Sequence, residues 1–217
     1  MLKDVASEVA VPLPLECSFR LLGEKLPVNN GYLIFAAICT VLDDRLPPGV
    51  GLFSVGSKLY DGEHLYLRGD AVLRFRLTQP ELPSVLQLAG KGIDVGGCSV
   101  LIGTSSIRVA PSSPTLYSRL VTFKNAMDEG SILQHAMGAL KDLGITAEVS
   151  LPGNRRGQYV GLPQRRIVKI RNDKVVGYGL TISNLNPGDA QKLLVHGMGG
   201  RRHMGCGIFE AVPEEQS

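Results

Sequence analysis

A glycine-rich segment near the end of the chain combines residue types that can hold phosphate groups. Residues 197–209 read Gly-Met-Gly-Gly-Arg-Arg-His-Met-Gly-Cys-Gly-Ile-Phe, here called the Gly-rich loop. Glycine lets backbone approach a ligand closely, and arginine offers a planar fork of donors that suits phosphate oxygens. The segment then enters a strand-like stretch, unlike a nucleotide loop that opens a helix. We interpret it as a grip on a phosphate backbone, with candidate contacts Gly197, Gly199, Gly200, Arg201, Arg202, His203, Gly205 and Gly207.

A second basic segment precedes the Gly-rich loop. Between Pro152 and Asn172 the chain carries six arginines and lysines and no aspartate or glutamate. One such run alone favours a solvated basic face, but two in the same half of the chain favour nucleic-acid binding. The sequence contains no recognition-helix pattern for a DNA major groove and no RRM aromatic signature, so we expect an RNA helix read through its shape and phosphates. The candidate contacts are Arg155, Arg156, Arg165, Arg166, Lys169 and Arg171.

Composition and charge exclude several classes of protein. The chain has 217 residues, 44% of them hydrophobic and 20% charged, with a formal net charge of +3. No apolar run reaches the roughly 18 residues of a membrane span, and the acidic start is not typical of a signal peptide. The four cysteines stand far apart, without the spacing of a metal site or a disulfide framework. We therefore expect a cytoplasmic protein with no metal, no cofactor and no membrane association.

The elements expected in the second half give the basic segments a scaffold. Hydrophobic periodicity separates strands from helices, Gly144 ends one helix, and Asn186-Pro187 opens another. The order is that of a split βαβ, or ferredoxin-like, unit, with a hairpin that carries part of the basic segment. The expected strands are 116–123, 145–151, 166–170, 175–182 and 206–212, and the expected helices are 130–143 and 186–195.

The first half is compatible with a less regular copy of the same unit of strands and helices. We expect a mostly buried helix at 31–42, and an edge strand at 9–21 because prolines interrupt its alternating pattern. Further strands are expected at 52–55, 64–67, 72–77 and 99–102, and a second helix at 83–89. A short linker at 111–114, Pro-Ser-Ser-Pro, interrupts regular secondary structure and separates the two halves. We therefore predict an α+β fold of tandem ferredoxin-like domains, 1–110 and 115–217, the second of which ends in the Gly-rich loop.

Three sequence blocks follow one another in a specific arrangement. The stretch Leu26-Pro27-Val28-Asn29-Asn30-Gly31-Tyr32 precedes the first helix, an arginine-bearing hairpin begins at Arg165, and the Gly-rich loop follows the last helix. Together they resemble the Cas-six family of CRISPR-associated endoribonucleases in the RAMP superfamily, most closely its MYXAN-like branch. The resemblance covers nearly the whole chain, and the Gly-rich loop is its most specific part.

This resemblance implies a function in CRISPR RNA maturation. Such proteins bind the repeat stem-loop of precursor CRISPR RNA and cut at its 3′ base without a metal ion. A ribose 2′-OH attacks the adjacent phosphate, which requires a base, a proton source and positive charge near the developing phosphorane. They often keep the product, so the implied partners are the crRNA 3′ stem-loop and other Cas proteins of an effector complex.

One position departs from the family pattern. Related sequences place Asp-His before the Gly-Tyr pair, and that histidine is the expected general base, whereas this chain has Asn29-Asn30. An amide has no pKa suited to proton transfer near neutral pH, whereas histidine titrates near about 6.5. The catalytic candidates are Asn30, as the position of the expected base, and Tyr32, Lys58 and His203.

The sequence leaves two alternatives to an RNA-cleaving enzyme. In the first, the missing histidine makes the protein a catalytically inactive subunit that binds the repeat hairpin within an effector complex. In the second, the two ferredoxin-like units form a regulatory pair that binds a small molecule. The arginine-rich segment without acidic residues argues against this second alternative.

Overall fold

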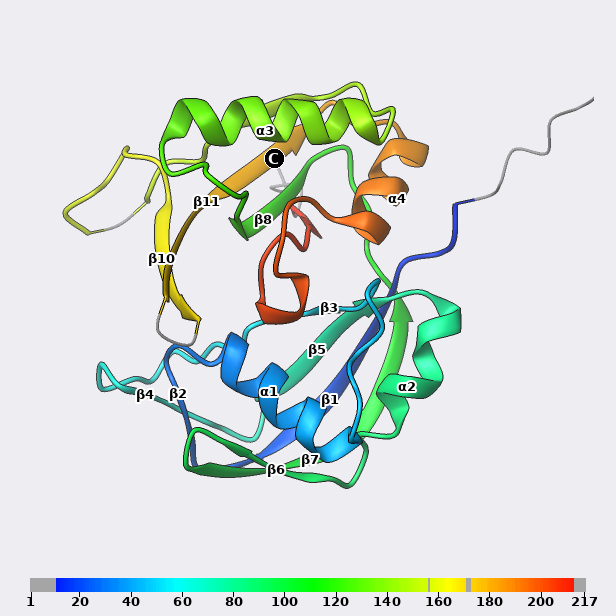
Figure 1. The fold of residues 1–217 in the computed structure, drawn as a ribbon, viewed down its shortest axis with the longest axis vertical. Coiled ribbons are helices and arrows are strands. Elements are labelled where there is room, and N and C mark those ends of the chain that lie inside the picture. Colours follow the sequence, from blue (N-terminus) through cyan, green and yellow to red (C-terminus); the bar gives the residue numbers. More distant parts are fainter. Residues whose placement is uncertain (1–10, 156, 171–172, 213–217) are drawn as a thin grey trace, which may run out of the picture.

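Two antiparallel sheets, one from each half of the chain, form the frame of the molecule (Figure 1). The computed structural model describes residues 11–155, 157–170 and 173–212. The strands are β1 (Leu15–Gly23), β2 (Lys25–Pro27), β3 (Gly51–Leu52), β4 (His64–Tyr66), β5 (Val72–Leu77), β6 (Gly92–Val95), β7 (Cys98–Val109), β8 (Leu116–Val121), β9 (Glu148–Ser150), β10 (Arg165–Ile170), β11 (Asp173–Ser183) and β12 (Glu210–Ala211). The helices are α1 (Gly31–Leu42), α2 (Leu82–Leu86), α3 (Glu129–Asp142) and α4 (Pro187–His196), with short 3-10 turns η1 (Gln79–Glu81) and η2 (Arg202–Met204).

The N-terminal sheet has the strand order β3-β5-β1-β7-β6. Its first four strands, with α1 after β1 and α2 after β5, have the ferredoxin-like arrangement, and β6 is added outside β7. Apolar residues alternate along β1 and β5, so Phe19 and Phe75 meet edge to face, with their ring centroids 5.9 Å apart, in the core beneath α1. The opposite face of this sheet carries charged side chains, among them Glu16 and Arg76, which are neighbours across β1 and β5.

The C-terminal sheet has the order β10-β11-β8-β12, and β9 pairs with the far end of β11. With α3 after β8 and α4 after β11, this is the predicted ferredoxin-like order, in which β9 and β10 together occupy the outer edge of β11. Helices α3 and α4 pack on one face of the sheet (Figure 1). The predicted fold class, tandem ferredoxin-like units, is confirmed.

Local sequence explains where the helices of the second half begin. Asp128 accepts a hydrogen bond from the Ser131 backbone N–H at 2.9 Å and caps α3. Asn186 caps α4 in the same way through the Asp189 N–H at 2.9 Å, and Pro187 occupies the first helical turn, where its missing donor is not needed. These caps place both helices close to their predicted bounds.

Two strand predictions are wrong in detail. β1 lies between β5 and β7 and is not an edge strand, because Pro12 and Pro14 precede it and remove no ladder hydrogen bond. The strand predicted at 206–212 is only Glu210–Ala211, because residues 206–209 belong to the packed Gly-rich loop. The turn of the expected hairpin, between the predicted strands 166–170 and 175–182, falls partly outside the described residues.

Each half has its own hydrophobic core. One cluster runs from Cys17 to Ile102 and the other from Leu116 to Phe209. These separate cores support the division into domains 1–110 and 115–217, which stays a prediction. Among the residues that the structure describes, no helix is long and apolar enough to cross a membrane.

Candidate nucleic-acid interface

The Gly-rich loop is wedged between the two halves of the molecule (Figure 1). On one side, the Gly207 N–H donates to the Leu120 carbonyl of β8 at 2.7 Å. On the other side, Gly205 packs against Ser54, and the Met204 carbonyl lies where a side chain on Gly31, the first residue of α1, would have to be. The glycines of the loop therefore allow close contacts within the protein. Glycine also gives the backbone the flexibility that binding a phosphate needs.

The other loop glycines divide between buried and open positions. A Cβ on Gly197 would collide with the Gly207 carbonyl, and a Cβ on Gly207 would collide with the Met198 carbonyl. Gly199 meets the Thr122 carbonyl in the same way, while Gly200 has open space around it. Gly199 and Gly200 are exposed, so they are the loop glycines best placed to meet a ligand.

Replacing Gly205 with alanine is expected to destabilise the protein by about 1–2 kcal/mol, because its φ of +83° is strained for any residue with a Cβ. The added methyl would also press on the backbone N of Ser54 at 3.1 Å. Gly200→Ala is the matched control, since its Cβ would meet nothing within 4 Å. Urea unfolding of both variants measures the difference, and equal stability would contradict the wedged position.

The two loop arginines point in different directions. Arg201 is exposed and has left-handed backbone, with φ of 64°. Arg202 turns back into the protein, where its guanidinium donates to the Val195 carbonyl at 2.8 Å. Burial lowers the pKa of Arg202 to about 10, and the positive charge of Arg76 acts in the same direction. Arg201 is therefore available to a phosphate, whereas Arg202 anchors the loop.

Asn30 is a structural clamp at the start of α1. It is 1% exposed, and its side-chain amide donates to the carbonyls of Pro27 at 3.1 Å and Val55 at 2.9 Å. Its Oδ1 accepts from the Val55 N–H at 3.0 Å. The amide thereby ties the segment after β3 to α1, and its polar atoms are used within the protein.

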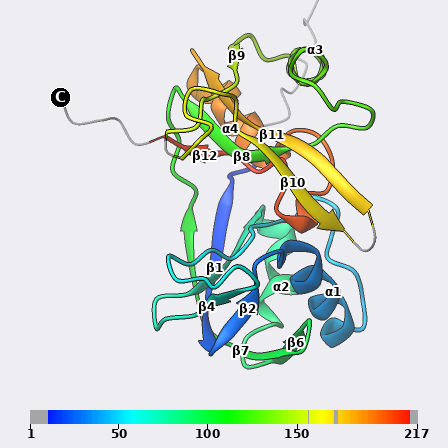
Figure 2. The same cartoon turned by 90° about the vertical axis from the view of Figure 1, so that its left-hand side faces the viewer.

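Tyr32 and His203, predicted from distant segments, come together on the outer side of α1. Both line a cavity between α1, the loop after it and the Gly-rich loop, called here the aromatic cavity. Tyr32 also lines a neighbouring cavity with Asn29 and with Lys169 of β10. The hairpin of β10 and β11 extends toward α1 in Figure 2. The start of α1 is therefore the place where hairpin, helix and Gly-rich loop meet.

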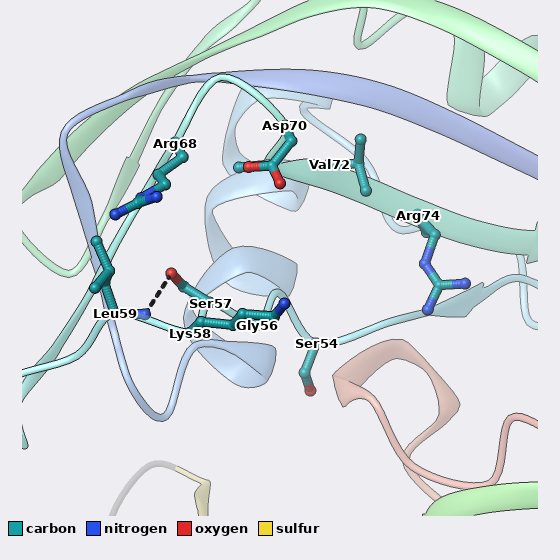
Figure 3. A pocket seen from close by; sticks show the side chains of 10 residues that line it. Ser54, Gly56, Ser57, Lys58, Leu59, Arg68, Asp70, Val72 and Arg74 are labelled. Atoms are coloured by element: carbon teal, nitrogen blue, oxygen red, sulfur yellow. Dashed lines mark hydrogen bonds between the residues drawn. The ribbon is translucent and has the colours of Figure 1, made fainter.

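Lys58 lines a different cavity, of about 590 Å3, which is formed by the segment after β3, by the start of β5 and by the residues before β5 (Figure 3). Two further cations, Arg68 and Arg74, and one acid, Asp70, line this basic cavity. The hydroxyl-bearing Ser54, which touches Gly205, connects its rim to the Gly-rich loop. Arg74 is paired with Glu210 at 2.6 Å, so Lys58 and Arg68 against Asp70 leave a net positive charge that attracts phosphate.

The basic hairpin presents its side chains on alternate faces. Arg165 and Lys169 are exposed on one face of β10, together with the apolar Ile167. Arg166 lies on the other face, where its Nε donates to the carbonyl of Arg119 on β8 at 3.2 Å. Arg155 is exposed in the loop before the hairpin. The predicted contacts Arg156 and Arg171 lie outside the described residues.

A buried ionic cluster on the polar face of the N-terminal sheet was not predicted. Glu16 of β1 pairs with Arg76 of β5 at 2.8 Å and with Arg108 of β7 at 2.6 Å. Arg76 also donates to the Phe209 carbonyl at 3.0 Å, and so connects the two halves. Burial by itself raises the pKa of Glu16, but hydrogen bonds and positive charge from the two arginines outweigh it and hold that pKa below its ordinary value.

Arg74, next to this cluster on β5, reaches the second half directly. It pairs with Glu210 of β12 at 2.6 Å and lies over the Phe53 ring at 4.2 Å. A sequence pattern for these residues exists, because Arg74 and Arg76 alternate with Leu73 and Phe75 along one strand. This period of two places both arginines on the face opposite the core.

Comparisons with known proteins agree on one family. The family model Cas6, described as Cas6 Crispr, matches residues 15–214. The chain is 34% identical over 194 residues to a CRISPR-associated endonuclease Cas6 of Myxococcus xanthus strain DK1622, covering 88% of this chain and 78% of that relative.

Solved structures share the fold at low identity. The product of a Cas6-related gene from Pyrococcus furiosus aligns with a TM-score of 0.65 and 10% identity, over 94% of this chain and 100% of that one. A RAMP protein described as binding different RNA substrates aligns with the same TM-score and 10% identity, over 92% of this chain and 100% of the other. At this level of identity the likeness concerns the fold.

Proposed function

Because the chain belongs to the Cas6 family, we propose that it acts in CRISPR RNA maturation as a metal-independent endoribonuclease. It binds the repeat stem-loop of precursor CRISPR RNA and cleaves at the 3′ base of the stem. It then keeps the crRNA 3′ stem-loop, in a cytoplasmic effector complex with other Cas proteins. Family membership over nearly the whole chain also removes the support for a small-molecule regulatory pair.

One observation carries the proposal beyond family membership: the basic cavity lies directly beside the Gly-rich loop. Ser54 belongs to the cavity wall and touches Gly205 of the loop, so cations from both segments border one surface. Lys58 and Arg68 supply positive charge on the cavity side, and the exposed Arg201 supplies it on the loop side. A phosphate backbone laid over this junction meets cations on both sides.

The reaction needs few groups from the protein. The attacking 2′-OH must lose a proton, the leaving 5′ oxygen must gain one, and the phosphorane must be stabilised by positive charge. Lys58 and Arg68 are placed for stabilisation of charge. Asn30 offers no base, because its amide is buried and bonded to Pro27 and Val55. Proton transfer therefore falls to another group. Of the remaining candidates Lys58, Tyr32 and His203, Lys58 lines the basic cavity, and Tyr32 and His203 line the aromatic cavity.

The Asn30 clamp also favours a second candidate function. A buried amide that makes three hydrogen bonds to two residues of the protein is suited to holding the fold and not to proton transfer. A protein that had lost its base in this way would bind the repeat hairpin and act as the subunit that caps the 3′ end of the guide RNA. Binding would then persist without cleavage.

A cleavage assay in EDTA decides between the two. A 5′-labelled repeat hairpin RNA is incubated with the wild-type protein, Asn30→His and Asn29→His, and the products are separated on a denaturing gel. We expect the wild type to cleave and to leave a 2′,3′-cyclic phosphate. Asn29→His is the matched control, because it adds a histidine at the neighbouring exposed position.

The remaining outcomes are equally informative. Tight binding without cleavage by the wild type, with activity gained only in Asn30→His, would establish the RNA-holding subunit instead. A thermal unfolding curve for Asn30→His checks that the buried imidazole is tolerated. Absence of RNA binding by the wild type would contradict both functions.

A further inference from the structure

The aromatic cavity has a volume of about 710 Å3 and is unlike the basic cavity in its chemistry. Tyr32, Phe35 and Cys39 line it from α1, at spacings of three and four residues that place them on one stripe of the helix. Pro47 closes it from the loop after α1, and His203 closes it from the Gly-rich loop. The cavity is thus an aromatic and apolar slot of the size that ligands of a few rings occupy.

Two contacts fix the orientation of His203 in the cavity wall. Its ring stacks on Phe35, with the centroids 5.2 Å apart and the planes 22° apart, and its Nε2 lies 3.0 Å from the Pro47 carbonyl oxygen. Because a carbonyl only accepts, Nε2 carries a proton. In the neutral ring, Nδ1 is then the acceptor that a ligand can use. The wall therefore combines a fixed flat surface with one polar edge.

Arg45 adds a second polar group to the lining. It is exposed, and none of the ion pairs within the described part of the chain involves it. Asp43 and Asp44 come directly before it and are also exposed. Their negative charges disfavour a phosphate at this position. The arrangement therefore suits a neutral, flat ligand with hydrogen-bonding groups on its edge.

We propose that the aromatic cavity holds one unpaired nucleobase of the RNA strand that flanks the repeat stem. A base has a π face that stacks on aromatic side chains, and a polar edge that Arg45 and His203 can bond. Arg201 lies two residues from His203, at most about 7 Å along the chain, so a phosphate bound by Arg201 lies close to a base held in the cavity. The inference rests on the RNA-binding function proposed above.

The test compares two RNAs: the repeat hairpin with unpaired nucleotides on both sides of the stem, and the same stem-loop trimmed flush. In Phe35→Leu, affinity for the tailed RNA is expected to fall about tenfold, the order of magnitude of one base stacked on an aromatic ring. Affinity for the trimmed RNA is expected to stay unchanged. Arg45→Ala, at an exposed position, is a second variant with the same expected selectivity and little risk to folding.

The chain offers a matched control in its other half. Phe123 packs on His135, with the ring centroids 5.4 Å apart, so Phe123→Leu removes the aromatic member of a second phenylalanine–histidine pair. This variant is expected to bind both RNAs as the wild type does. Thermal unfolding of all variants separates a loss of binding from a loss of fold.

Three results would overturn the inference. Phe35→Leu and Arg45→Ala that leave the affinity for the tailed RNA unchanged would do so, and so would an equal loss on both RNAs. A thermal shift with free nucleoside monophosphates, combined with equal affinity of the wild type for both RNAs, would indicate a small-ligand site instead. Failure of the wild type to bind either RNA would reject the proposed function itself, and is distinguishable from these results.

Discussion

Glu16→Ala is expected to lower the free energy of unfolding by about 3–5 kcal/mol, the cost of leaving a buried charge without its partner. Glu16 is 2% exposed and Arg76 is 1% exposed, so water cannot replace the lost carboxylate. Arg76 also donates to the Phe209 carbonyl, so the loss is expected to loosen the contact between the two halves. Urea unfolding measures the change, and Glu24→Ala, at an exposed position, serves as control with an expected effect within about 0.5 kcal/mol.

The same cluster predicts a pH dependence whose sign follows from the lowered pKa of Glu16. A carboxylate with a lower pKa in the folded state stabilises the protein above its unfolded pKa. That stability is lost as the pH falls from about 4.5 through the folded pKa. Glu16→Gln removes the titrating group, so its melting temperature should decline less steeply in this acid range than that of the wild type. Parallel curves for the two proteins would contradict the prediction.

The fold of the second half could be predicted because its boundaries are marked by local chemistry. Asp128 and Asn186 cap α3 and α4 through hydrogen bonds to residues three positions later, and such pairs are visible in the sequence. The position of β1 was not predictable in this way. Its neighbours β5 and β7 come from far along the chain, and Pro12 and Pro14 fall just outside the strand.

The Gly-rich loop shows where composition stops being informative. Glycine permits close approach by any backbone, and the sequence does not say whether the approaching group is a phosphate or another part of the same chain. In the structure, Ser54 fills the space where a side chain on Gly205 would lie, and the Met198 carbonyl fills that space at Gly207. The corresponding space at Gly200 is open. The close approach that the glycines allow is therefore made partly within the protein, and the binding of a phosphate backbone by this loop stays a prediction.

The candidate site was predictable in part for a similar reason. His203 and Tyr32 were recognised as chemical groups, but their meeting on α1 depends on how the Gly-rich loop folds back across the two halves. Arg74 and Arg76 alternate with apolar residues, and this period of two predicts that both arginines lie on the same face of the strand. It does not reveal that the second half, through Glu210 and Phe209, covers that face.

The adjacent arginines of the Gly-rich loop provide the second large effect, because the structure gives them opposite roles. Arg202→Ala is expected to destabilise the protein by about 1–3 kcal/mol, since it leaves the partly buried Val195 carbonyl without its donor. Arg201→Ala is expected to change stability little, because this side chain is exposed. It should instead weaken RNA binding and reduce the slope of log affinity against log salt by about 0.7–0.9, the contribution of one phosphate contact.

Urea unfolding and RNA titrations over a range of salt, run on both variants, test this contrast directly. Arg202→Lys keeps the positive charge but not the planar fork of donors. Its free energy of unfolding should therefore stay below that of the wild type, whereas a purely electrostatic role for Arg202 predicts wild-type stability. If Arg202→Ala instead flattened the salt slope with unchanged stability, the guanidinium would have to leave Val195 on binding RNA. The Gly-rich loop would then rearrange around its ligand, and the inward orientation of Arg202 would describe only the protein without RNA.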